Sequence, residues 1–352
     1  MLDYKRILLG LPFLVRSGGV KSSRIVKTRE NYFPSKLVPG KKFRFKFFYC
    51  DEFIQENRPT ILLTHGMSGY GIDDIRMTEA ATNLTVCGYT VVVPEFEEIK
   101  ALKISQESPR NIKDAFLIIL DQKDLNTESI GFFSISFSAG FGLIAFTDPE
   151  ISTKVKSIIA IGGFAEILDT CNFAMLNYEK DDYPTNILFY NYIHLLYDNC
   201  EELAKAFYEA ALDNGLSRRG KDQVAPRIYE NLSKGHREIF DRVKTSATFR
   251  KELGLKISQA YEKEAKSISP IYFIEKIKAP VCLLHGKNDD VISENESIKL
   301  SKQMNAYNID HVLELTGLLS HGDKIPFWKQ LSSLPGLSHA FGYFFENLRE
   351  KK

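Results

Sequence analysis

The stretch "GFFSISFSAG" at residues 131–140 decides the fold, because it joins a strand pattern to a helix pattern. The apolar run "SIGFF" is typical of a buried strand, and "FSAGFGLIAF" is typical of a helix. A serine at the apex of a tight strand–turn–helix can be a catalytic nucleophile. The usual signature is Gly-x-Ser-x-Gly, because the residues two before and two after the apex must be small. Here serines replace both glycines.

Three serines compete for the apex of this turn. Ser136 has a small residue on each side, Ser134 and Ser138. An apex at Ser134 would place the large Phe132 two residues before it, and an apex at Ser138 would move the turn into the helix. We therefore predict that Ser136 is the apex. Serines also cap helix N-termini, so the motif alone leaves a capping role open.

Short branched-aliphatic runs recur along the chain and alternate with helix-like segments at about 73–87, 109–122 and 137–147. This alternation predicts a parallel sheet with right-handed crossovers. Residues 43–48, "FRFKFF", alternate apolar and basic side chains, as in a half-exposed strand near a sheet edge. The predicted fold class is α/β, with a mostly parallel central sheet flanked by helices. The expected sheet strands are 60–66, 89–96, 129–136, 155–164, 279–286 and 310–317.

The alternation of strand and helix patterns stops after residue 164 and starts again near residue 279. The intervening residues are rich in Tyr, Phe, Leu, Glu and Lys at helical spacing, as in "ILFYNYIHLLYDNCEELAKAFYEAAL". We predict a mainly helical insertion over 165–277, with a loop at "DNGLSRRGKDQVAPR". The α/β core then spans 59–164 and 278–352, and residues 1–58 form an N-terminal segment and edge strands.

Two downstream stretches supply partners for a serine nucleophile. The serine needs a general base, and the base needs a carboxylate that fixes its tautomer. "LLHGKNDDVI" places acids just beyond one strand, and "LTGLLSHGD" places His321 just beyond the next. The chain order Ser136, Asp289, His321 is the order expected for this architecture. Asp289 is favoured because it lies three residues after Gly286, and Asp290 remains the alternative acid.

The other six histidines suit the base less well. His194 and His236 lie in the insertion, and His65 and His285 each precede a loop glycine. His311 begins a strand, and His339 lies in the last helix. Of these we expect His65 to brace its loop.

The stretch "LLTHGMSGYG" follows the first parallel strand. Its glycine-containing loop can bring the backbone N–H of Met67 near the nucleophile. With the N–H of Phe137, that donor would form an oxyanion hole.

Asp73, Asp74 and Arg76 resemble a helix start. For Arg76 a local ion pair bracing this loop is favoured over binding of a substrate carboxylate.

The composition excludes several classes of function. The 352 residues fit one large α/β domain with an insertion, or two smaller domains. The net charge of +1, with acids and bases mixed, gives no reason to expect nucleic acid as a partner. The five scattered cysteines predict reduced thiols, no zinc site and a cytoplasmic protein.

The N-terminal stretch "MLDYKRILLGLPFLVRSGG" combines basic and apolar residues. It can be read as a weak signal sequence or a membrane-surface anchor. Against both, Asp3 comes early, Arg16 closes the apolar run and no A-x-A site follows. We predict a segment packed on the domain, with membrane association or export through residues 1–16 as the alternative.

With these residues in place, the chain resembles the α/β-hydrolase superfamily, and most closely a largely uncharacterised group of bacterial serine hydrolases. The resemblance rests on "HGMSGYGIDDIR", "VVVPEF" and "SISFSAG" followed by "AIGGF". It implies Ser136 as nucleophile, His321 as base and Asp289 as its orienter, with Met67 and Phe137 as oxyanion donors. It also implies that the insertion over 165–277 is a cap or lid. The two serines in place of glycines depart from the family pattern.

The expected activity is cofactor-free hydrolysis of a carboxylic ester through an acyl-enzyme, with a small-molecule ester as substrate. An aromatic cluster in the insertion can line an apolar acyl pocket, although its helical spacing is more typical of ordinary core: Phe189, Tyr190, Tyr192 and Tyr197. The alternatives are a thioesterase or carbon–carbon bond hydrolase on the same scaffold, and a non-catalytic binding protein.

Overall fold

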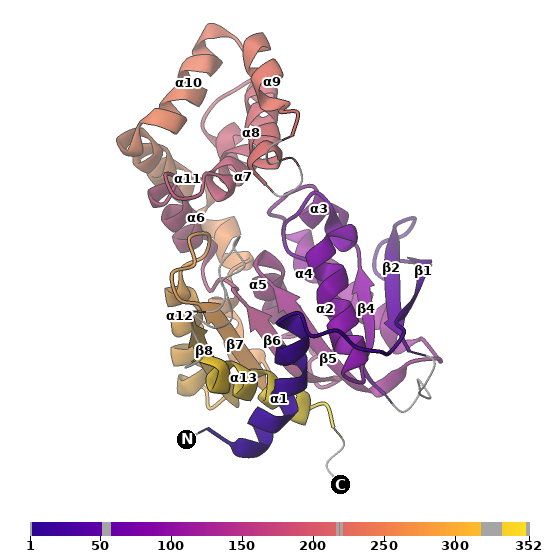
Figure 1. The fold of residues 1–352 in the computed structure, drawn as a ribbon. Helices are drawn as coiled ribbons and strands as arrows, with labels where there is room; N and C mark the ends of the chain where they lie inside the picture. The colour runs from indigo at the N-terminus through magenta and orange to yellow at the C-terminus, as the bar shows by residue number, and fades with distance from the viewer. Residues whose placement is uncertain (1, 51–57, 216–217, 219–220, 318–332, 350–352) are drawn as a thin grey trace.

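The computed structural model describes residues 2–50, 58–215, 218, 221–317 and 333–349 (Figure 1). These residues form one eight-stranded sheet with the strand order β1-β2-β4-β3-β5-β6-β7-β8. β1 and β2 pair antiparallel, as do β2 and β4, and all other neighbours pair parallel. The predicted fold class is confirmed. The strands are β1 (Lys27–Pro34), β2 (Lys42–Tyr49), β3 (Pro59–Thr64), β4 (Thr90–Pro94), β5 (Asn126–Ile135), β6 (Val155–Ile161), β7 (Val281–Gly286) and β8 (His311–Thr316).

Helices cover both faces of the sheet because successive strand residues point to opposite sides. Leu62 and Phe132 pack into one core, and Leu63 and Phe133 pack into the other. The first core is covered by α4, α5 and α12, and the second by α1, α2 and α13. The bounds of these helices are α1 (Tyr4–Ser17), α2 (Ile75–Val86), α4 (Glu107–Leu120), α5 (Phe137–Ala145), α12 (Glu294–Ala306) and α13 (Leu334–Glu346), with the short α3 at Glu97–Lys100.

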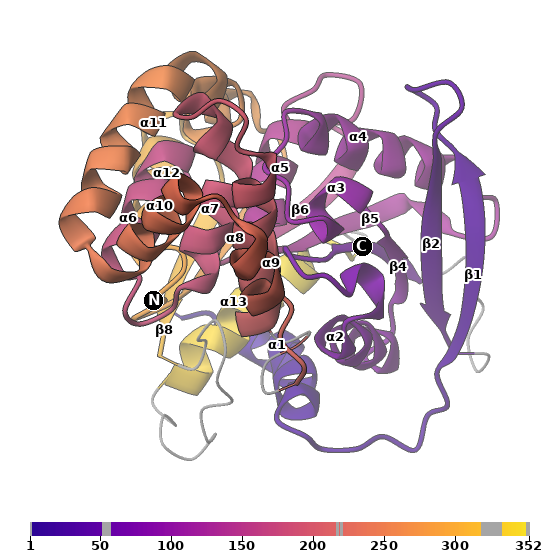
Figure 2. The ribbon, with the colours of Figure 1, turned by 90° about the horizontal axis from the view of Figure 1, so that it is seen from above.

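The described residues between β6 and β7 form helices and their connections, as expected for 165–277. Seen from above, these helices lie on the side of the molecule that holds α12 and β8, away from the edge strands β1 and β2 (Figure 2). The helices are α6 (Ile167–Leu176), α7 (Tyr183–Tyr192), η3 (Ile193–Leu195), α8 (Glu201–Asn214), α9 (Ala225–Asn231), α10 (Lys234–Thr245), α11 (Ala247–Ser267), η4 (Pro270–Tyr272) and η5 (Ile274–Lys276).

The loop expected at 213–227 is shorter at both ends than predicted. α8 continues to Asn214, and α9 begins at Ala225. The buried carboxylate of Asp213 accepts hydrogen bonds from the backbone N–H groups of Val224 and Ala225. These bonds satisfy donors at the start of α9 that have no partner inside the helix.

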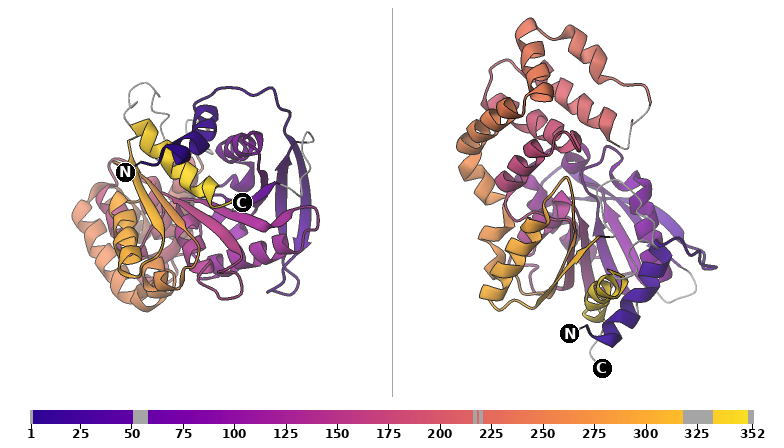
Figure 3. Two further views of the ribbon diagram at one scale, coloured as in Figure 1. Left: turned by 90° about the horizontal axis from the view of Figure 1, so that it is seen from below. Right: turned by 60° about the vertical axis from the view of Figure 1, so that its left-hand side comes forward.

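The N-terminal segment forms α1, which lies beside α13 at the end of the molecule opposite the insertion (Figures 1 and 3). Asp3 caps α1 by accepting from the N–H of Lys5 at 2.8 Å. Phe13 packs against Phe341 with ring centroids 4.8 Å apart, and Arg6 pairs with Glu346 at 2.7 Å. The prediction of a segment packed on the domain is confirmed. Among the described residues, no helix combines the length and apolar character needed to cross a membrane.

Candidate active site

Ser136 lies at the turn between β5 and α5 and has an unusual backbone conformation. Its φ of 59° and ψ of −136° fall outside the regions that residues with a side chain normally adopt. Such strain costs about 1–3 kcal/mol and persists only where the surroundings impose it. Here the N–H of Ser136 donates to the carbonyl of Ile161 at 2.7 Å. In the described part of the chain, its side chain makes no capping hydrogen bond to α5.

The two flanking serines are buried and hydrogen-bonded. Ser134 Oγ accepts from Thr64 Oγ1 at 2.7 Å, and Ser138 Oγ donates to the carbonyl of His65. Both bonds link β5 or α5 to the end of β3. The small side chains therefore fit the tight turn and also tie it to the neighbouring strand.

Ser136 lies at the carboxyl edge of the parallel strands, where the chain connections change direction. From β3 the chain passes to β4 on one side, and β5 lies on the other side of β3. Ligands of open α/β sheets bind at such switch points. A Cβ atom on Gly66 would lie 3.2 Å from Ser136 Cβ and 3.8 Å from its Oγ. The loop that carries Met67 therefore passes directly beside the Ser136 hydroxyl.

An ion pair between Asp74 and Arg76 stabilises the loop that follows β3. Arg76 donates to both carboxylate oxygens of Asp74, at 3.0 and 2.8 Å, and Ser68 Oγ donates to the same carboxylate at 2.8 Å. Burial alone would raise the pKa of Asp74, but the hydrogen bond and charge of Arg76 outweigh burial and lower it. The local ion pair predicted for Arg76 is present.

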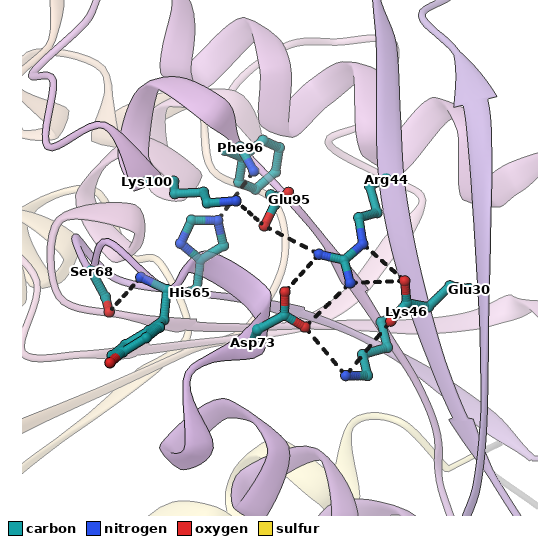
Figure 4. A network of polar contacts seen from close by, with 10 residues as sticks. Glu30, Arg44, Lys46, His65, Ser68, Asp73, Glu95, Phe96 and Lys100 are labelled. Carbon is teal, nitrogen blue, oxygen red and sulfur yellow. Dashed lines mark hydrogen bonds and ion pairs between the residues drawn. The ribbon is translucent and has the colours of Figure 1, made fainter. Parts of the chain in front are cut away.

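A second network holds the same loop to the edge of the sheet (Figure 4). Asp73, in the 3₁₀ helix η2 (Gly71–Asp73), accepts from Arg44 at 2.7 Å and from Lys46 at 3.4 Å. The hydrogen bond from Arg44 lowers the pKa of Asp73. Arg44 also bonds Glu30 on β1 at 2.9 Å. Strands β1 and β2 thereby hold the loop to their edge of the sheet.

His65 acts as a brace, as predicted. Its Nε2 accepts from the N–H of Phe96 at 3.1 Å, so its proton lies on Nδ1, which donates to the carbonyl of Gly66 at 2.9 Å. The ring is fully buried, and burial lowers its pKa. His65 thus joins the end of β3 to the segment after β4 in its neutral form (Figure 4).

The two candidate acids after β7 have different surroundings. Asp289 is buried, and its Oδ1 accepts from the N–H groups of Val291 and Ile292 at 2.9 and 3.0 Å. Asp290 is partly exposed and pairs with Lys180 of the insertion at 3.0 Å. Asp289 therefore has a fixed carboxylate at the carboxyl end of β7, whereas Asp290 forms a surface ion pair.

His321 lies outside the described residues. The chain leaves β8 at Thr316, whose carbonyl accepts from the N–H of Lys287 at 2.7 Å. β8 pairs with β7 up to the register Gly286–Thr316. The loop that carries Asp289 and the exit from β8 are therefore neighbours at the same sheet edge as Ser136.

A cavity of about 100 Å³ lies between the insertion and this edge of the sheet. From the core it is lined by the two predicted oxyanion residues, Met67 and Phe137, together with Ser136, Arg76 and Val291. Its insertion side is mostly apolar and includes Ala174, Pro184, Ile187, Leu188 and Leu212. The strained Ser136 and the apolar residues of the insertion therefore line the same cavity.

The aromatic cluster of the insertion does not contribute to that wall. Phe189 packs against Phe207, Tyr190 against Tyr208 and Tyr192 against Tyr261 as tilted ring pairs, with centroids 4.6–5.1 Å apart. Its interpretation as ordinary core is confirmed for these three residues, and Tyr197 is likewise packed against the core rather than lining the cavity.

Tyr183 is a site residue that the sequence did not reveal. Its hydroxyl donates to the carbonyl of Met67 at 2.9 Å, and its ring lines the cavity. Burial raises its pKa, so it remains a neutral donor. Tyr183 sits in the first turn of α7, next to Pro184. Nothing local in the sequence distinguishes it from the other tyrosines of the insertion.

In the described residues, no group of three or more His, Cys, Asp or Glu side chains is arranged to hold a metal ion. All five cysteines are free thiols.

Comparison with known proteins supports the fold. The family model described as BD-FAE, an α/β-hydrolase family, matches residues 231–304. No curated protein matches the sequence. Among solved structures, Porphyromonas gingivalis dipeptidyl peptidase 4 is similar with a TM-score of 0.52 at 10% identity, over 89% of this chain and 35% of that one. Pyrococcus horikoshii acylaminoacyl peptidase gives 0.54 at 14% identity, over 95% and 43%.

A bacterial brefeldin A esterase, described as a homologue of human hormone-sensitive lipase, is similar with a TM-score of 0.53 at 11% identity. That match covers 98% of this chain and 86% of the esterase. The chain spans well under half of each of the two peptidases but most of the esterase. The chain therefore has the α/β-hydrolase fold, and the comparisons support its place in the α/β-hydrolase superfamily.

Proposed function

We propose that the protein is a serine hydrolase that cleaves a carboxylic ester through an acyl-enzyme intermediate formed on Ser136. The observation that carries this proposal is the strained backbone of Ser136, at a strand-to-helix turn that faces a cavity. An ordinary helix cap has no need of such a conformation, whereas a nucleophile at the apex of a tight turn requires it.

The proposed base is His321, and Asp289 orients it. His321 takes the proton of the Ser136 hydroxyl as the oxygen attacks the acyl carbonyl, and returns it to the leaving alcohol. Water activated by the same histidine then cleaves the acyl-enzyme. Asp289 suits the orienting role because backbone donors already hold its carboxylate in the buried loop after β7.

The proposed oxyanion donors are the backbone N–H groups of Met67 and Phe137. Phe137 follows Ser136 at the first position of α5, where N–H groups lack intrahelical partners. Met67 follows Gly66, which lies beside the Ser136 side chain. The Tyr183 hydroxyl and the ion pair of Asp74 with Arg76 hold the Met67 loop in place before substrate binds. Such preorganised donors stabilise the developing charge most effectively.

The proposed substrate is a small ester with an apolar acyl part. The insertion acts as a cap, because its aliphatic residues close the cavity over Ser136. Aliphatic walls favour a hydrocarbon acyl chain through burial of apolar surface.

A second candidate reaction is hydrolysis of a peptide or other amide bond, since several proteins of similar fold are described as peptidases. The chain spans less than half of each of those peptidases, which makes the ester the leading proposal. A thioester or carbon–carbon bond substrate would use the same serine.

The decisive experiment combines fluorophosphonate labelling, peptide mapping and turnover of p-nitrophenyl butyrate. We expect the label on Ser136, and a loss of at least about a thousandfold in kcat for Ser136→Ala. His321→Ala should cause a comparable loss. Asp289→Asn should reduce kcat strongly, whereas Asp290→Asn, which removes only a surface ion pair, serves as the matched control.

Three outcomes would contradict the proposal. Unchanged turnover by Ser136→Ala excludes that serine as the nucleophile. Absence of labelling in folded wild-type protein favours a non-catalytic binding protein. Faster cleavage of an acyl-amino-acid p-nitroanilide than of the matched ester would replace the esterase by a peptidase.

A further inference from the structure

The N-terminal helix α1 has two apolar faces, only one of which is buried. Gly10, Phe13 and Leu14 are buried, in contact with α13 and the sheet. Tyr4, Leu8 and Leu11 are 71, 51 and 42% exposed. Their spacing of four and three residues places them on one side of the helix. α1 therefore presents an apolar stripe to solvent.

The stripe belongs to a local concentration of exposed apolar side chains. Thirteen large hydrophobic residues are exposed in the described part of the chain, and six of them lie within residues 2–25. Exposed hydrophobic residues that are scattered singly need no explanation, but a concentration of this kind marks an interaction surface. The six are Leu2, Tyr4, Leu8, Leu11, Val20 and Ile25.

The same segment is strongly basic. Residues 1–27 hold six basic side chains and one acidic one, whereas the whole chain holds 46 and 45. Arg6 pairs with Glu346 on α13, so one of these charges is neutralised. The acidic one, Asp3, caps the helix. The basic residues are Lys5, Arg6, Arg16, Lys21, Arg24 and Lys27.

We propose that α1 docks the protein on an anionic lipid surface. An amphipathic helix that carries an apolar stripe beside basic residues lies in the plane of the membrane interface, with its apolar side chains inserted and its cations at the head groups. Two copies of this protein meeting through the same face would bring their basic segments together, which like-charge repulsion disfavours. The charge therefore favours a lipid surface over a second copy.

The position of α1 suits this role. It lies beside α13 at the opposite end of the molecule from α8, α9 and α10 (Figures 1 and 3). A membrane contact through α1 leaves the insertion, and the cavity that it closes, uncovered. Docking also leaves the contact between α1 and α13 intact, because the two contacts use different faces of α1.

Co-sedimentation of the full-length protein with vesicles tests the proposal. We expect binding to phosphatidylcholine–phosphatidylserine vesicles that weakens with added salt, and little binding to pure phosphatidylcholine. The double variant Leu8→Ser/Leu11→Ser should bind at least about tenfold more weakly, since each buried apolar side chain adds to the partition free energy. Lys5→Glu/Lys21→Glu should weaken binding to the anionic vesicles.

Leu255→Ser is the matched control, because Leu255 is 54% exposed on α11 of the insertion. It should bind as wild type does, as should Ser136→Ala, so the outcome is independent of the proposed catalysis. Thermal unfolding of each variant confirms that exposed substitutions leave the fold intact. Equal sedimentation of wild type and Leu8→Ser/Leu11→Ser overturns the proposal. A dimer in light scattering that this variant abolishes, without vesicle binding, assigns the face to a second copy instead.

Discussion

Ser138 Oγ donates a hydrogen bond to the carbonyl of His65, which joins the first turn of α5 to the end of β3. A second link lies one residue earlier on β3, where Thr64 Oγ1 donates to Ser134 Oγ. Ser136 is thus flanked by two hydrogen bonds to the same strand. Glycines at the flanking positions would fit the turn but would supply neither bond. Compared with glycines, the two serines therefore have less backbone freedom but add two hydrogen bonds to the neighbouring strand.

The first prediction concerns the bond from Ser138. Ser138→Gly restores the commoner pattern at this position but removes a buried hydrogen bond, so we expect the free energy of unfolding to fall by about 1 kcal/mol or more. Fluorophosphonate labelling of Ser136 should persist. Urea unfolding measures the change. Ser267→Ala is the control, because its exposed hydroxyl bonds only a carbonyl of its own helix and should contribute less than about 0.5 kcal/mol. A Ser138→Gly variant as stable as wild type would contradict this role.

The second prediction concerns pH and His65. Burial lowers its pKa in the folded protein below the 6.5 of the unfolded chain. As pH falls below about 6.5, the unfolded state takes up a proton that the folded state resists, so stability falls. His65→Gln keeps an acceptor for the Phe96 N–H but does not titrate. The advantage of wild type over His65→Gln should therefore shrink on acidification, by up to about 1.4 kcal/mol per pH unit.

Urea unfolding of both proteins between about pH 7.5 and 5.5 measures this difference, within the window in which an unfolded histidine titrates. A difference in stability that stays constant across the range would show that His65 does not carry the proton linkage.

The core of the fold was predictable because its strands are buried on both faces and read as apolar runs. The six predicted runs correspond to β3 through β8. β1 was not separately predicted, since "KTRENYFP" is polar and mostly exposed, and only its pairing with β2 makes it a strand. The contact of α1 with α13 joins opposite ends of the chain, and no local pattern reveals such a partner.

The site was predictable only in part, because many of its contacts join elements that are far apart in the sequence. The apex at Ser136 follows from small flanking residues, a local constraint. The braces of the Met67 loop, such as Arg44 with Asp73, depend on strand order across the sheet. The cavity wall depends on how the insertion docks. Its conspicuous aromatic residues pack mainly with one another, and smaller aliphatic residues such as Leu188 reach the cavity.

The third prediction tests the contact between α1 and α13. A Cβ atom on Gly10 would overlap the carbonyl oxygen of Ser338, and neither backbone can move without separating the helices. Gly10→Ala should therefore lower the free energy of unfolding by about 1–3 kcal/mol and speed proteolysis near α1. Gly235→Ala is the matched control, because among the described residues nothing lies within 4 Å of its added Cβ and it is in α10. That variant should be as stable as wild type or slightly more stable. Identical unfolding of Gly10→Ala and wild type would contradict the tight contact.

The last prediction concerns the length of the acyl chain. Leu212 lines the cavity from α8 and is only partly buried, so its replacement should disturb folding less than that of the fully buried Leu188. Leu212→Ala lengthens the apolar cavity, and Leu212→Trp fills it. Each methylene that gains a buried place is worth about 0.8 kcal/mol, or roughly a fourfold change in kcat/KM. Leu212→Ala should therefore raise the ratio of octanoate to butyrate p-nitrophenyl ester turnover by about three- to tenfold, and Leu212→Trp should shift preference toward acetate.

Leu255→Ala, on the exposed surface of the insertion, should leave the ratio unchanged. The same chain-length profile in both Leu212 variants would show that the acyl group lies elsewhere.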